Sequence, residues 1–178
     1  PGLAVLTPNP RTSGGARWNY LAAWGHAVRA RRGDEAGARR FIGELFANVP
    51  MLETDARSAM LAFVRRGLGD VLIAWESEAL LAAQSGIAGF DVVVPAVSIL
   101  AEMPVAAIDR NVERRATGAL AEAYLRFLYQ PEAQEIGARH FHRPRDPGSP
   151  ARLRDRFPPI ELFPLAAMFG SWREAHAP

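Results

Sequence analysis

The chain has 178 residues, 49% of them hydrophobic and 22% charged, with a formal net charge of only +2. This length suits one or two domains with a sizeable core. All 21 basic residues are arginines, a usage that indicates a G+C-rich genome more than a nucleic-acid-binding surface. The absence of cysteine excludes disulfides and thiolate metal sites. No apolar run is long enough to cross a bilayer, and no targeting segment is visible.

The first element is an apolar run, residues 3–6, which predicts a strand that leads into a turn over residues 7–10. A helix is expected over residues 16–32. Ser13 is suited to cap this helix, because its hydroxyl accepts a hydrogen bond from a free first-turn amide. Gly14 and Gly15 leave backbone amides bare, and a helix N-terminus favours anions. These residues predict either an anion cradle made of backbone or an ordinary strand-to-helix turn.

Two amphipathic helices follow. Asp34 is expected to cap the first, whose apolar stripe runs from residue 38 to residue 46 at helical spacing. Thr54 or Asp55 is expected to cap the second, which ends at Gly67.

The next segments alternate between strand and helix. Residues 71–75 predict a buried parallel strand, and residues 76–84 predict a helix directly after it. This alternation predicts an α/β fold. In an open α/β sheet the carboxyl ends of the strands face the ligand crevice, so the end of this strand is a candidate site.

The remaining chain is expected to hold one more strand and several helices. Pro131 is well placed at the first position of a helix. In chain order we expect a strand over 90–94, an extended stretch over 103–108, a helix capped by Thr117 and reaching Tyr129, a helix from Pro131, a surface segment over 143–159, and a terminal helix over 165–175.

Longer blocks of sequence are more specific than these patterns. They are TPNP at residues 7–10, SGGARWNYLAAWG at 13–25, GDVLIAWESEALL at 69–81, SILAE at 98–102, AEAYL at 121–125 and FHRPRD at 141–146. In order and spacing they closely resemble the periplasmic sulfate-binding proteins of sulfate/thiosulfate ABC importers. The resemblance implies a periplasmic-binding-protein-like lobe with a mostly parallel sheet flanked by helices, and an incomplete first lobe.

The resemblance also implies how the chain is organised. Residues 1–100 would form the core of the second lobe with the anion cradle. Residues 101–178 would hold the hinge return, near residues 98–104, with partial first-lobe elements and C-terminal helices. Because the family has two lobes that close on sulfate, we expect this chain to be a fragment that lacks the N-terminal half of the first lobe.

The implied function is solute binding in the periplasm, without enzymatic activity. Sulfate or thiosulfate, the membrane permease of an ABC importer and the missing lobe are the implied partners, with no nucleic acid among them. We find no catalytic set, expect no cofactor, and find no pattern of metal ligands.

The family's sulfate donors can be transferred residue by residue. They fall on the hydroxyl of Ser13, the backbone amides of Gly14, Gly15 and Ala56, and the indole N–H of Trp75, with Arg57 supporting the site from behind. All of these groups donate. Sulfate carries no proton at neutral pH, whereas phosphate would bury an O–H group without an acceptor, at a cost of about 1–3 kcal/mol. A donor-only site therefore discriminates against phosphate.

One position departs from the family pattern. Asp55 stands where the family tends to have small residues, and its carboxylate would compete with the anion for the amides of the third helix. Three alternatives to a sulfate receptor follow: a receptor for another tetrahedral oxyanion such as molybdate, a paralogue that does not bind, and, from another class, an arginine-rich nucleic-acid-binding module.

Overall fold

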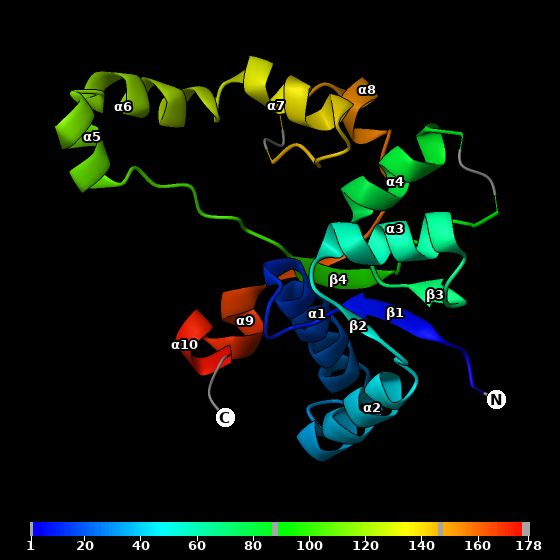
Figure 1. Cartoon of the computed structure of the whole chain (residues 1–178). Coiled ribbons are helices and arrows are strands. Elements are labelled where there is room, and N and C mark those ends of the chain that lie inside the picture. Colours follow the sequence, from blue (N-terminus) through cyan, green and yellow to red (C-terminus); the bar gives the residue numbers. More distant parts are fainter. Residues whose placement is uncertain (1, 87–88, 146–147, 176–178) are drawn as a thin grey trace. The chain divides into compact units, whose positions relative to one another are not determined.

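The computed structural model describes residues 2–86, 89–145 and 148–175. The chain forms two compact units: unit 1 holds the residues up to Ala101 and those from Pro159 on, and unit 2 is Glu102–Pro158. Strands β4 (Val97–Leu100) and β5 (Glu161–Pro164) of unit 1 pair in parallel, so unit 2 is inserted between two paired strands (Figure 1). The division falls inside residues 98–104, and the assignment of the units to lobes stays a prediction.

A three-stranded parallel sheet lies in unit 1, in the order β2-β1-β3. Its strands are β1 (Val5–Pro8), β2 (Leu52–Glu53) and β3 (Val71–Leu72). The central strand is buried throughout and lies two residues further along the chain than predicted, because Thr7 and Pro8 pair with β2. The predicted strand over 71–75 pairs only through Val71 and Leu72. Val71 is 41% exposed because β3 is an edge strand, so its predicted burial is wrong.

Four helices connect and flank these strands: α1 (Gly14–Ala30), α2 (Glu35–Ala47), α3 (Ala56–Arg66) and α4 (Glu76–Gln84). The two predicted caps, Ser13 on α1 and Asp34 on α2, are confirmed by hydrogen bonds from Ala16 and Gly37 amides. Helix α1 begins earlier than expected, because the capping bond from Ser13 places both glycines within its first turn.

The boundaries of α3 and α4 follow the same local signals. Asp55, rather than Thr54, caps α3, and Gly67 ends it in the left-handed conformation at φ 62°. Helix α4 spans the predicted residues, 76–84. Helix α3 contacts all three strands of the sheet, whereas α1 contacts β1 and β4.

A hydrophobic cluster in unit 1 joins α1 to the two-stranded sheet of β4 and β5. Its buried residues are Trp18, Leu21, Ile99, Phe163 and Leu165. Two predictions are wrong here. Residues 90–94, all described, form no strand, because β5 pairs with residues 97–100 instead. The expected terminal helix is two short helices, α9 (Leu165–Phe169) and α10 (Trp172–Ala175), because Gly170 with φ 69° interrupts it.

Unit 2 contains α5 (Asp109–Arg115), α6 (Gly118–Phe127), α7 (Pro131–Arg139) and α8 (Ala151–Arg154). Pro131 opens α7 as predicted. Thr117 precedes α6 without a side-chain capping bond, and α6 ends before Tyr129. The segment over 143–159 is not only surface: it contains α8, whose Leu153 is buried.

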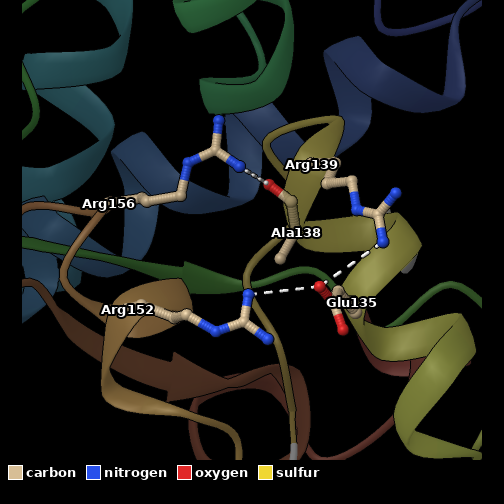
Figure 2. A network of polar contacts seen from close by, with 5 residues as sticks. All are labelled: Glu135, Ala138, Arg139, Arg152 and Arg156. Carbon is tan, nitrogen blue, oxygen red and sulfur yellow. Dashed lines mark hydrogen bonds and ion pairs between the residues drawn. The ribbon is translucent and has the colours of Figure 1, made fainter.

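Polar contacts tie α8 to α7 within unit 2. The Glu135 carboxylate pairs with Arg152 at 3.2 Å and with Arg139 at 3.4 Å, while Arg156 donates to the Ala138 carbonyl at 3.1 Å (Figure 2). The hydrogen bond and charge of Arg152, followed by those of Arg139, hold the pKa of Glu135 below its usual range. These arginines therefore act first as structural partners of unit 2.

Candidate functional site

The candidate site lies where the three parallel strands end and three helices begin. Strands β1, β2 and β3 lead into α1, α3 and α4, so all three helix N-termini lie at the carboxyl edge of one sheet. Two hydrogen bonds join neighbouring loops: the Thr12 hydroxyl donates to the Thr54 carbonyl at 2.9 Å, and the Asn9 amide donates to the Glu53 carbonyl at 2.7 Å. This edge is where open α/β sheets bind ligands.

Ser13 is the predicted N-cap of α1, and Gly14 and Gly15 are its first two residues, although the sequence placed them just before the helix. Ser13 is buried, and its Oγ accepts a hydrogen bond from the Ala16 amide at 3.3 Å. Gly14 is exposed, with open space where a Cβ would lie. A helix start of this kind presents amide donors and a partial positive charge.

Trp75 approaches the same helix start from the segment between β3 and α4. A Cβ on Gly15 would lie 2.7 Å from Trp75 Nε1 and 3.6 Å from Ser13 Oγ, so the indole N–H, the hydroxyl and the Gly15 backbone converge on one spot. Trp75 is half-buried, packs against the core around Trp18, and is the N-cap residue of α4, without a side-chain capping bond. The close approach explains why position 15 requires glycine.

Ala56 and Arg57 open α3 at the same edge of the sheet. Ala56 is half-buried and Arg57 is exposed. The Asp55 carboxylate accepts hydrogen bonds from the Ser58 amide at 2.9 Å and the Ser58 hydroxyl at 3.1 Å. These bonds, the amide bond first, lower the pKa of Asp55 below its usual value. Asp55 thus folds onto the helix N-terminus, as the sequence suggested.

Sequence reasoning missed the part that Glu78 plays here. It lies in the first turn of α4, and its Oε2 is buried with no hydrogen-bond partner among the described residues. Burial raises the pKa of Glu78, the charge of Arg57 lowers it, and that of Asp55 raises it. In the sequence Glu78 looks like any exposed glutamate of a helix. Only the packing of the folded chain shows that one of its carboxylate oxygens is buried.

Asn19 was also missed. From α1 its side-chain amide donates to the Ile73 carbonyl, just after β3, at 3.0 Å. The bond fixes the start of α1 relative to the chain that carries Trp75. An asparagine among the apolar positions of a predicted helix was the available signal, because a half-buried amide needs a partner.

Two further observations restrict the chemistry of the described residues. No group of three or more histidine, cysteine or acidic side chains in them is placed to hold a metal ion. None of the helices in the same residues combines the length and the apolar character needed to span a membrane.

The comparisons with known proteins agree on one family. The family model described as bacterial extracellular solute-binding protein matches residues 1–143. The sulfate-binding protein of Salmonella typhimurium is 52% identical over 98% of this chain, and the thiosulfate-binding protein of Pseudomonas aeruginosa is 45% identical over 97% of it.

A solved structure shows the same fold. The sulfate-binding protein SubI from Mycobacterium tuberculosis superposes with a TM-score of 0.78 and 29% identity over 98% of this chain and 58% of its own. The chain spans about half the length of the curated relatives, 54% and 52% of the two named above. With its parallel sheets flanked by helices, the chain belongs to the bacterial extracellular solute-binding protein family.

Proposed function

We propose that this chain supplies the anion-binding lobe of a receptor for sulfate or thiosulfate. Relatives named sulfate-binding and thiosulfate-binding proteins match nearly the whole chain, and the structural neighbour is a sulfate-binding protein. Such a receptor serves a membrane permease of an ABC importer and works outside the cytoplasm. It binds and releases its solute and catalyses no reaction.

The convergence of Trp75 on the start of α1 carries the proposal. The indole nitrogen lies within 2.7 Å of the point where a Gly15 Cβ would project, and Ser13 Oγ lies 3.6 Å from that point. An indole N–H only donates, and so do the backbone amides beside it. A small acceptor with negative charge on every side is therefore the ligand that this spot favours.

A tetrahedral dianion meets these donors without a charged side chain. The dipoles of the helix N-termini supply partial positive charge. Within the proposal, Ser13 donates its hydroxyl, Gly14 and Gly15 donate amides, and Trp75 donates its indole N–H. Ala56 donates an amide at α3, and Arg57 stabilises that turn without contacting the anion. The Ser13 hydroxyl accepts from Ala16 and keeps its own proton for the ligand.

We expect the chain alone to bind weakly. The relatives are about twice as long as this chain, and we expect the rest of such a receptor to contribute further donors. A hydrogen bond to a charged group contributes about 1.5–3 kcal/mol, so the loss of several donors weakens binding by orders of magnitude. A dissociation constant in the low micromolar range for the isolated chain would contradict this expectation.

Tryptophan fluorescence tests the proposal directly. Titration with sulfate and with thiosulfate, against chloride at matched ionic strength, is expected to give a saturable change in the unmodified chain. Trp75→Phe should abolish the change. Trp24→Phe is the matched control: Trp24 lies further along α1, where it stacks on Tyr20, and its loss should leave the titration intact. A response that survives Trp75→Phe would refute the proposed site.

A further inference from the structure

Asp55 changes the chemistry of the candidate site at the start of α3. Both of its carboxylate oxygens are engaged, one with the Ser58 amide at 2.9 Å and one with the Ser58 hydroxyl at 3.1 Å. A carboxylate has about four acceptor positions. Two of them remain for a ligand, because the side chain is exposed.

Two observations place Asp55 among the helix starts of the candidate site. The Thr12 hydroxyl, one residue before Ser13, bonds to the carbonyl of Thr54, one residue before Asp55. The charge of Asp55 also reaches the first turn of α4, where it raises the pKa of Glu78 against the opposing charge of Arg57. Asp55 therefore lies close enough to α1 and α4 to act on an anion bound between them.

The consequences differ between two kinds of oxyanion. Asp55 accepts a hydrogen bond from a backbone amide of α3 and adds a negative charge. Both effects oppose the binding of a fully ionised dianion such as sulfate. It also adds an acceptor to a cradle otherwise made of donors. Phosphate at neutral pH carries at least one O–H group, which can donate to such an acceptor. Its dihydrogen form also has a smaller negative charge than sulfate.

We propose that Asp55 is a specificity-determining residue, which narrows the preference of this cradle for sulfate over oxyanions that carry a proton. The inference rests on the proposed function, since it concerns the selectivity of the same site. The hydrogen bonds that stabilise the ionised form keep Asp55 charged through the neutral pH range, so the effect operates where phosphate is partly protonated.

The test compares sulfate with inorganic phosphate at neutral pH, in the whole chain, by following the Trp75 indole N–H resonance in NMR titrations that measure weak binding. Asp55→Gly removes the charge, the acceptor and the cap. Asp55→Asn removes the charge but keeps a capping oxygen. Asp34→Gly is the control, because Asp34 caps α2 through an equivalent bond to the Gly37 amide at 2.9 Å.

We expect Asp55→Gly to raise the ratio of the phosphate to the sulfate dissociation constant by about 10- to 100-fold, the equivalent of one charged hydrogen bond. Asp55→Asn should raise it in the same direction, and Asp34→Gly should leave it unchanged. A ratio that stays the same in both Asp55 variants overturns the inference while the proposed function stands. If neither anion moves the indole resonance in any variant, the proposed function itself fails, and the inference fails with it.

Discussion

Gly14 and Gly15 stand side by side at the start of α1, yet the structure predicts opposite results for their replacement by alanine. A Cβ on Gly14 would meet nothing within 4 Å. A Cβ on Gly15 would lie 2.7 Å from Nε1 and 3.3 Å from Cε2 of Trp75. Both variants keep their own backbone amide as a donor. Any difference between them therefore reports the close approach of the Trp75 indole to Gly15.

The magnitudes follow from two opposing effects. Alanine is favoured over glycine within a helix by about 0.5–1 kcal/mol, and Gly14→Ala should gain up to this amount. Gly15→Ala has the same gain but forces the Trp75 ring to move, and overpacking of this kind costs about 1–3 kcal/mol. We therefore expect the free energy of unfolding of Gly15→Ala to be lower than that of Gly14→Ala by about 1–3 kcal/mol.

Urea denaturation measures this difference, and the indole N–H resonance of Trp75 reports the displacement. Gly15→Ala should shift that resonance and weaken sulfate binding by about 10- to 100-fold, since one charged hydrogen bond is lost. Gly14→Ala should change neither. Equal stability of the two variants, with an unmoved indole resonance in both, would refute the contact between Gly15 and Trp75.

Two further predictions concern packing and pH. A Cβ on Gly25 would lie 2.4 Å from Phe163 Cζ, in the core between α1 and β5. Gly25→Ala should therefore lower the free energy of unfolding, measured by urea denaturation, by about 1–3 kcal/mol. Gly43→Ala is the control and should not lower it, because a Cβ there would meet nothing within 4 Å. Burial raises the pKa of Glu78, so the proton-linked stability of the folded chain is present at acid pH and lost as the pH rises through the folded pKa. Urea denaturation at acid and neutral pH should then show that Glu78→Gln is stabilising mainly at neutral pH; an advantage independent of pH would contradict this.

Much of the helical architecture is predictable from local signals in the sequence. Ser13 and Asp34 cap their helices, Gly67 ends α3, and Pro131 opens α7 as expected. Each of these depends on a residue's own hydroxyl, carboxylate or backbone conformational preference, which acts within one helical turn. The α/β class follows from the alternation of elements, and the resemblance to the family follows from short blocks distributed between residues 7 and 146.

The strand pairing and the character of the site were decided by the tertiary structure. Residues 90–94 and 97–100 both contain β-branched residues, but only the second set pairs, because its partner β5 returns to unit 1 after the whole of unit 2. Similarly, the sequence assigns Trp75 to the site only through the family resemblance, whereas its close approach to Gly15 is a tertiary contact. Glu78 has the sequence context of an exposed helix residue, but in the folded chain one of its carboxylate oxygens is buried. Local patterns specify where an element begins and ends, whereas contacts between distant segments depend on which surfaces the folded chain brings together.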